Sequence, residues 1–240
     1  MPDATLIVVP TFNEAENIAA LVVAVRASLP EAHVLIVDDA SLDGTAQVVR
    51  RLAVDDPQVH LLERSGKLGL GSAYVAGFGW GLERGYQRFF EMDADFSHDP
   101  TALPAFVVAL DAGADVVVGS RGVPGGGIRG WGPLRYALSK GGSLYSRLVL
   151  GVEMRDLTTG FKAYSRRALE QIDLTTLRSN GYAFQIETSY RALRCGLRVV
   201  EIPIVFVDRR VGKSKMTLRE VWGGVAGVWL IRAGGKRSRP

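Results

Sequence analysis

Short apolar runs rich in valine, isoleucine and leucine recur along the chain and alternate with longer segments of helical spacing. Such runs, without polar alternation, predict strands that are buried on both faces of a parallel sheet. The predicted strands are residues 6–9, 34–37, 59–62, 89–92 and 115–119. The predicted helices are residues 15–29, a helix ending near 52 that Ser41 or Asp43 would cap, 73–85 and 101–111. This alternation predicts right-handed βαβ units and an α/β fold with a mostly parallel, Rossmann-like sheet flanked by helices.

The pattern changes after Arg121. Residues 122–132 are rich in glycine and predict a mobile loop, and residues 133–150 predict a helix. On this helix Arg135 and Ser139 are four residues apart and share one face, where they would either bind a phosphate or form a solvated polar edge. Its apolar stripe would consist of Leu134, Leu138, Tyr145 and Val149.

The C-terminal third predicts a polar turn leading into a short strand at 156–164, a helix at 182–193 and an extended segment at 199–207. Residues 217–231 predict an amphipathic helix with Trp222 and Trp229 on one face, followed by a basic tail at 236–239. Such a helix suits an anionic lipid surface. It equally suits packing on the domain or on a second subunit, and both interpretations remain open.

Composition and charge limit the kinds of ligand and the cellular location that we expect. The net charge is +4 and the pI is near 9.3, a mild basic bias that suits an anionic ligand or membrane surface and does not indicate nucleic acid. Cys195 is the single cysteine, so an internal disulfide is excluded. We expect it to serve as a small apolar residue late in a helix. No signal peptide and no apolar run of membrane-spanning length is visible. We therefore expect a cytoplasmic chain that is peripheral on the cytoplasmic face of a membrane.

Candidate chemistry begins with Asp93 and Asp95, which follow a predicted strand and are one residue apart. On an extended chain both carboxylates would face one spot, where hard oxygen ligands suit Mg²⁺ or Mn²⁺ carried by a diphosphate. The alternative is an acidic turn in which either residue caps the next helix. The basic, glycine-rich residues 64–72 would bind a phosphate or serve as a flexible connector. Neither a dinucleotide-binding glycine motif nor a P-loop is present.

Several of these stretches together resemble glycosyltransferase family 2, with the GT-A fold, and within it the polyprenyl (dolichyl)-phosphate mannose synthases of the short type that lacks transmembrane helices. The resemblance covers nearly the whole chain in order. It rests on residues 10–14, 38–45, 93–98, 119–121, 158–161 and 209–215. It implies a catalytic domain over 1–216, with a donor half at about 1–121 and an acceptor half at about 122–216, and a helix and basic tail at 217–240.

The resemblance also implies roles for individual residues. Asp95 would be the first metal ligand, with Asp93 as a further candidate, whereas Ser97 replaces a metal-binding glutamine of some members and is a poorer ligand. The residues implied to hold GDP-mannose are Pro10, Phe12, Glu14, Val37, Asp39, Asp93, Ala94, Asp95, Arg121, Arg209 and Lys215. The residues implied to act at the acceptor phosphate are Arg121, Arg135 and Ser139, which complete the catalytic set with Asp95.

The implied reaction is an inverting transfer of mannose from GDP-mannose to a polyprenyl phosphate. A lipid monophosphate is largely a dianion at neutral pH and has little need of a general base. This agrees with the histidines, of which only His98 lies near the acidic pair. A membrane-anchoring partner protein is a further expectation. The alternatives are transfer of another sugar from a UDP-sugar, a nucleotide-sugar-binding protein without turnover, and a structural protein that uses only its tryptophan-bearing helix.

Overall fold

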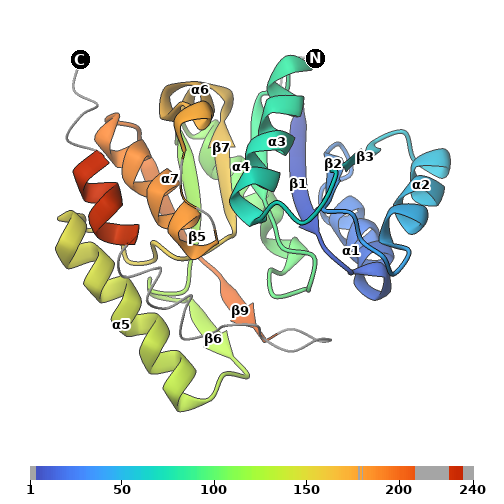
Figure 1. Cartoon of the computed structure of the whole chain (residues 1–240). Coiled ribbons are helices and arrows are strands. Elements are labelled where there is room, and N and C mark those ends of the chain that lie inside the picture. The colour runs from blue at the N-terminus through green and yellow to red at the C-terminus, as the bar shows by residue number, and fades with distance from the viewer. Residues whose placement is uncertain (1–3, 178, 180, 209–226, 235–240) are drawn as a thin grey trace.

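The computed structural model describes residues 4–177, 179, 181–208 and 227–234, and has helices on both sides of a central sheet (Figure 1). The strands are β1 Thr5–Thr11, β2 His33–Asp38, β3 Val59–Glu63, β4 Arg88–Glu91, β5 Val116–Ser120, β6 Gly127–Arg129, β7 Lys162–Ser165, β8 Val199–Pro203 and β9 Val205–Val207. The α-helices are α1 Ala15–Ser28, α2 Thr45–Asp55, α3 Leu70–Glu83, α4 Leu103–Asp111, α5 Pro133–Leu150, α6 Arg166–Ile172 and α7 Tyr182–Arg194. Two 3₁₀ turns, η1 Pro100–Ala102 and η2 Leu174–Thr176, and a helix at 227–234 complete the described elements.

Seven strands form the central sheet in the order β3-β2-β1-β4-β7-β5-β8. Neighbouring strands are parallel except at β7, which runs antiparallel to both β4 and β5. The carboxyl ends of β1, β2, β4 and β5 therefore share one edge of the sheet, and β7 begins at that edge. This confirms the predicted α/β fold with a mostly parallel sheet.

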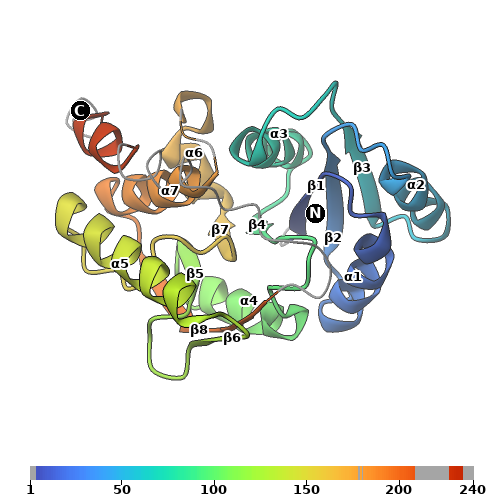
Figure 2. The same ribbon diagram turned by 60° about the horizontal axis from the view of Figure 1, so that its bottom comes forward.

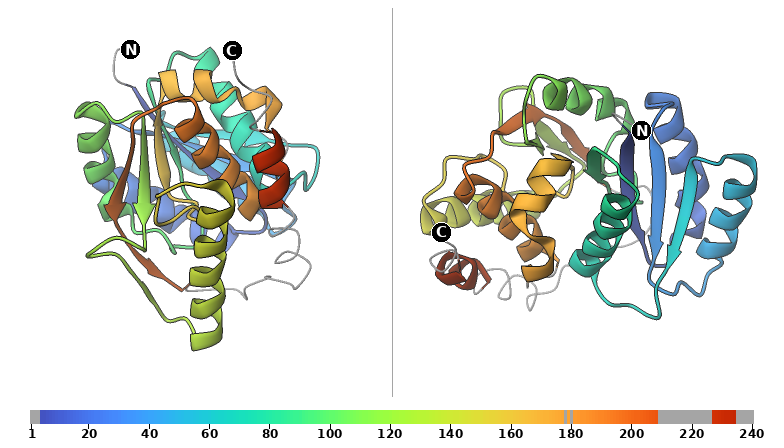
Figure 3. Two further views of the ribbon diagram at one scale, coloured as in Figure 1. Left: turned by 90° about the vertical axis from the view of Figure 1, so that its left-hand side faces the viewer. Right: turned by 90° about the horizontal axis from the view of Figure 1, so that it is seen from above.

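Successive residues of β1 face opposite sides of the sheet, as the period of a strand requires. Leu6 and Val8 belong to one core cluster, with side chains from α3, α6 and α7, whereas Ile7 and Val9 belong to a second, with side chains from α1 and α4. The helix sets lie on opposite sides of the sheet in Figure 2 and in the right-hand view of Figure 3. Burial on both faces explains why the strand sequences show apolar runs without alternation.

Helix α5 has the predicted bounds, because Pro133 suits its first turn and Gly151, with φ of +69°, ends it. The predicted apolar stripe is wrong for Leu138, which is 48% exposed, because the core lies against the other end of the helix, where Leu150 is buried. The glycine-rich segment before α5 is not only a loop. It contains β6, which pairs in parallel with β9 and forms a second small sheet.

The C-terminal half differs from expectation in two further places, at α6 and at Cys195. Helix α6 was not predicted; its start is marked by Ser165, whose side chain accepts a hydrogen bond from the backbone N–H of Ala168. Cys195 follows the last residue of α7 and is exposed, so it is not an apolar residue within the helix. Of the predicted helix at 217–231, residues 227–231 are helical and the remainder lies outside the described residues. Within the described ranges, no helix combines the length and apolar character needed to cross a membrane.

Two histidines stack at the outer strands of the sheet. His33 on β2 and His60 on β3 have ring centroids 5.2 Å apart, and their facing Nδ1 and Nε2 atoms are 2.9 Å apart. Burial lowers the pKa of both imidazoles below 6.5, and Arg26 near His33 and Arg84 near His60 act in the same direction. Because two nitrogens share one hydrogen bond, at most one ring can donate into it.

We predict that this pair makes the protein less stable as the pH falls below about 6.5. A lowered folded-state pKa means that the unfolded chain takes up protons first, which favours unfolding. The variant His60→Phe keeps a ring against His33 and Trp80 but does not titrate. Urea denaturation at pH 7.5 and 5.5 should therefore show a smaller loss of unfolding free energy in the variant than in the wild type. An equal loss in both proteins would contradict the prediction.

Candidate active site

The loops after the parallel strands meet at one edge of the sheet (Figure 2). Outside glycine, four described residues have positive φ, and three of them lie in these loops: Asn13 after β1, Ala40 after β2 and Phe96 after β4. A left-handed backbone at alanine or phenylalanine costs energy and persists only where the surroundings impose it. Strain therefore concentrates at the edge where α/β sheets bind their ligands.

The loops after β1 and β2 are joined by reciprocal hydrogen bonds. The N–H of Asn13 donates to Ser41 Oγ at 2.8 Å, and the N–H of Leu42 donates to Asn13 Oδ1 at 3.0 Å. The N–H of Ala15, at the start of α1, donates to Asp43 Oδ2 at 3.0 Å. Asp43 therefore stabilises the start of α1. At α2 the cap position is Gly44 and not Ser41 or Asp43, but Asp43 Oδ1 accepts a hydrogen bond from the N–H of Thr45, the first residue of that helix, at 3.0 Å.

Asp39 is buried between the two loops and the glycine-rich segment. Its Oδ2 accepts hydrogen bonds from the N–H groups of Leu68 and Gly69, and its Oδ1 lies 3.2 Å from Arg64 Nη1. In the same segment, Lys67 Nζ lies 4.2 Å from the centre of the Phe12 ring. Two amides of this glycine-rich segment are thus engaged by a carboxylate, which favours a structural role for that part of it.

The other predicted nucleoside residues lie on or beside the same two strands. Pro10 is on β1 and pairs with Val37 of β2 in the strand register. The Val37 side chain is fully buried against the position of Gly77, so only its backbone can contact a ligand. Glu14 precedes α1, and its N–H donates to Thr45 Oγ1 at 3.0 Å.

The acidic pair lies in a turn after β4 and not on the extended strand, because β4 ends at Glu91. Asp93 is 36% exposed, whereas Asp95 is buried and its Oδ1 accepts a hydrogen bond from the N–H of Ser97 at 3.0 Å. Neither caps the following helical turn, which corrects the capping alternative: that role belongs to Asp99, whose side chain accepts from the N–H of Thr101.

His98 completes the turn. Its ring is 1% exposed and stacks on Phe161 with centroids 4.9 Å apart, and its Nδ1 accepts a hydrogen bond from the N–H of Asp93 at 3.2 Å. Burial lowers the pKa of His98 to about 4. The imidazole is therefore neutral at physiological pH and fixes the backbone of the acidic turn.

Arg121 is held on the other side of the edge, after β5. Its Nε and Nη2 donate to the two carboxylate oxygens of Asp156, each at 2.7 Å, and Nη2 also donates to Thr158 Oγ1. Burial alone would raise the pKa of Asp156, but the hydrogen bonds and charge of Arg121 outweigh it and lower the pKa. Asp156 was not predicted as the partner of Arg121.

A cleft opens beside Arg121. Ser139 is on its wall, whereas Arg135 is one turn earlier on α5 and pairs with Asp208 at 2.9 Å. Sequence reasoning missed Ser143, although its spacing of four from Ser139 places both on one helix face. The cleft is lined by Arg121, Gly122, Ile128, Ser139, Lys140, Ser143, Arg155 and Asp156. Arg209 and Lys215 lie outside the described residues.

The side chains of the acidic turn fit a divalent metal that is shared with a phosphate ligand. Asp93 and Asp95 supply carboxylates, and the buried Ser97 is adjacent. Among the described residues, no group of three or more acidic, histidine or cysteine side chains forms a protein-only cage. One or two carboxylates fit Mg²⁺ or Mn²⁺, which take their remaining ligands from phosphate and water.

Comparison with known proteins connects this site to a family. The family model for glycosyl transferase family 2 matches residues 6–173. The chain is 48% identical to a polyprenol monophosphomannose synthase of Mycolicibacterium smegmatis, covering 98% of this chain and 90% of the relative. It is 47% identical to an undecaprenyl-phosphate mannosyltransferase of Micrococcus luteus, covering 94% and 90%.

Among solved structures, glucosyl-3-phosphoglycerate synthase from Mycobacterium tuberculosis, in complex with Mn²⁺, uridine diphosphate and glucosyl-3-phosphoglycerate, superposes with a TM-score of 0.68 at 19% identity. It covers 97% of this chain and 81% of the other. This likeness concerns the fold alone. The family match and the two close relatives show that the chain is a glycosyltransferase and belongs to glycosyl transferase family 2.

Proposed function

We propose that the protein transfers mannose from GDP-mannose to a polyprenyl phosphate with inversion at the anomeric carbon. The observation that carries the proposal is the placement of the acidic turn after β4 and the arginine-lined cleft after β5 at one edge of the sheet, on either side of β7. The two relatives that share nearly half of their residues with this chain are named for mannose transfer to a polyprenyl lipid.

The donor nucleoside would lie over the joined loops after β1 and β2. Phe12 offers an aromatic face there, and Asp39 holds the adjoining glycine-rich segment through Leu68 and Gly69. Pro10, Glu14 and the backbone of Val37 would complete the wall. The donor diphosphate would lie near Asp93, Ala94 and Asp95. Arg209 and Lys215, which lie outside the described residues, would be its cationic partners.

A bound Mg²⁺ or Mn²⁺, held by Asp95 with Asp93 as a second candidate, would offset the charge of the leaving diphosphate as a Lewis acid. Ser97 stands beside this site with its N–H already bonded to Asp95. A serine hydroxyl is a weaker ligand than a carboxylate, so we assign Ser97 no fixed metal contact.

The acceptor phosphate would enter the cleft beside Arg121 and Ser139, with Arg135 at its outer end. An oxygen of the lipid phosphate would form a bond to the anomeric carbon while the bond from that carbon to the diphosphate oxygen breaks, releasing GDP. A phosphate monoester has a second pKa of about 6 and is already a nucleophilic dianion near pH 7. The neutral, buried His98 is therefore not required as a base.

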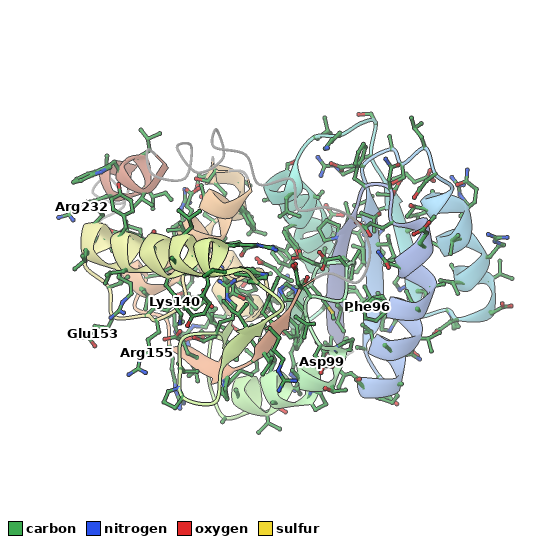
Figure 4. All side chains as sticks on the ribbon, turned by 90° about the horizontal axis from the view of Figure 1, so that it is seen from below. Phe96, Asp99, Lys140, Glu153, Arg155 and Arg232 are labelled. Carbon is green, nitrogen blue, oxygen red and sulfur yellow. The ribbon has the colours of Figure 1, made fainter. Side chains whose placement is uncertain are left out.

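Access to a lipid acceptor would come from the surface around α5. Its exposed apolar side chains are Tyr136, Leu138, Leu144 and Leu148, and the neighbouring helix at 227–234 adds Trp229 and Leu230. Lys140, Arg155 and Arg232 are disposed around these helices (Figure 4). Apolar residues flanked by cations suit a peripheral contact with an anionic bilayer. A membrane-anchoring partner could bind the same surface.

We predict that the purified chain transfers labelled mannose from GDP-mannose into an organic-extractable polyprenyl phosphate in the presence of Mn²⁺. Asp95→Ala should lose this activity by at least about 100-fold, because the leaving diphosphate is no longer neutralised. Asp99→Asn is the matched control, since it alters a nearby acidic residue that caps η1 and should retain transfer. Transfer from UDP-glucose but not GDP-mannose would contradict the proposed donor, and nucleotide-sugar binding without transfer would indicate a binding protein.

We predict that Asp156→Ala lowers the free energy of unfolding by about 3–5 kcal/mol, because it leaves the Arg121 guanidinium, 9% exposed, without its buried partner. Glu63→Ala breaks the exposed pair with Arg50 and should cost less than about 1 kcal/mol. Urea denaturation measures both. Equal losses would mean that Arg121 is not held by a buried ion pair.

We predict that replacing Leu144 and Leu148 together by serine weakens binding to vesicles containing anionic lipid by about tenfold or more, because each leucine buries apolar area in the interface. Both side chains are exposed, at 53% and 73%, so folding should be unaffected. The control replaces Val23 on α1 and Val54 on α2, which are 64% and 83% exposed, by serine. Binding is measured by vesicle sedimentation. Equal binding of the two double variants would contradict membrane contact through the α5 surface.

A further inference from the structure

A network of buried polar side chains lies beneath the acidic turn and has no role in the proposed mechanism. Lys162 of β7 is fully buried, and its Nζ donates to the backbone oxygen of Gln185 at 2.6 Å, to Gln185 Oε1 at 2.8 Å and to Thr188 Oγ1 at 3.1 Å. Glu91 pairs with Lys162 in the strand register and accepts a hydrogen bond from the Tyr164 hydroxyl at 2.8 Å. Burying a lysine is costly, so such a network needs a reason.

The lysine fixes the orientation of the Gln185 side chain. Burial lowers the pKa of Lys162 to about 8, so the amine is mainly an ammonium near pH 7 and can only donate. The amide must therefore turn Oε1 toward Lys162 and its NH₂ group away from it. The nearby Glu91 carboxylate can take at most one of the two N–H groups of this amide. Gln185 Nε2 makes no hydrogen bond of normal geometry to any described residue, and Gln185 is only 3% exposed.

The unpaired amide borders the space above Gly160. A Cβ atom placed on Gly160 would lie 3.5 Å from Gln185 Nε2, 3.7 Å from His98 Cε1 and 3.8 Å from Asp93 Oδ1. These are ordinary van der Waals distances, and Gly160 does not have a positive φ, so an alanine would fit without strain. Gly160 and Asp93 are both partly exposed, and the space above Gly160 is therefore accessible to a ligand.

The chemistry around this space selects the ligand. An amide N–H donates and a carboxylate accepts, and a hydroxyl group can satisfy both at once because it also donates and accepts. A phosphate oxygen has no proton to give to Asp93, so it could approach that carboxylate through a bound cation but not through a direct hydrogen bond. A sugar attached to a diphosphate near Asp95 brings hydroxyls to this position.

We infer that the space above Gly160 is the subsite for the donor sugar, that Gln185 determines specificity by donating a hydrogen bond to one sugar hydroxyl, and that Lys162 is the positioning residue for its amide. This inference rests on the proposed function, since it assigns the sugar of the same donor. It extends the site to β7 and α7, which carry none of the donor contacts named above.

The test compares the binding of GDP and of GDP-mannose to the full chain with Mn²⁺ by isothermal titration calorimetry. Gly160→Ala fills the subsite and should weaken the binding of GDP-mannose by roughly tenfold. The affinity for GDP should equal that of the wild type, because only the sugar reaches this space. Gly79→Ala is the control, since a Cβ at Gly79 meets nothing within 4 Å. Equal effects of Gly160→Ala on both ligands, or no effect on either, would overturn the assignment.

Gln185→Met gives an independent readout, because it keeps the side-chain length and removes the donor. It should weaken GDP-mannose and spare GDP, and Lys162→Met should do the same. A series of GDP-deoxymannoses, each lacking one hydroxyl, identifies the group that Gln185 contacts. The member that lacks this hydroxyl should bind equally well to the wild type and to Gln185→Met. If Gln185→Met weakens the binding of every member by the same factor, the role of Gln185 is overturned. If these variants are unfolded in thermal melts, the Gly160→Ala result alone decides whether the space above Gly160 is the sugar subsite.

Failure of the proposed function gives a different result. A wild-type chain that binds another nucleotide sugar but not GDP-mannose would refute the mannose donor. The effect of Gly160→Ala on that nucleotide sugar, compared with its nucleoside diphosphate, would then still support or overturn the sugar subsite.

Discussion

The pairing of β7 with both β4 and β5 is the constraint on which the site depends. A four-residue antiparallel strand enters between two parallel strands, so the segment before it meets the turns that leave its neighbours. The N–H of Gly119 donates to the oxygen of Phe161 at 2.9 Å, and the Phe161 ring stacks on His98. Without this insertion, the acidic turn and Arg121 would belong to adjacent strands, with no room for Thr158 and Gly160 between them.

The two sides of the site differ in rigidity. Arg121 is held by a buried carboxylate and a hydroxyl, and the loops after β1 and β2 are joined by reciprocal hydrogen bonds. Such groups reach a ligand without reorganising, which is the advantage of preorganised electrostatics. Arg135 pairs with Asp208, and both side chains are partly exposed. An incoming phosphate can therefore compete for Arg135 far more easily than for Arg121.

Local sequence was sufficient for much of the fold. The β-branched runs gave the buried strands, and Pro133 and Gly151 marked α5 to the residue. Long-range features were not accessible: Asp156 lies 35 residues from Arg121, and nothing near it in sequence indicates the ion pair. The short strand expected near residue 164 is β7, but its antiparallel insertion between β4 and β5 depends on long-range pairing that four residues do not encode. Leu138 was assigned to the core because periodicity does not show where along a helix the core ends. The roles proposed for Asp93 and Asp95 came from strand alternation and from the resemblance, and the alternation does not apply because β4 ends at Glu91.

The exposed apolar side chains of α5 and of the helix at 227–234 have a kinetic consequence for an enzyme that works from that surface. Adsorption would confine the protein and its acceptor to one plane, so the encounter rate would depend on the mole fraction of acceptor in the bilayer and not on its amount per volume of solution. Diluting the acceptor with inert lipid would then slow turnover even when every vesicle is saturated with protein. In this way the local concentration of acceptor is a property of the membrane.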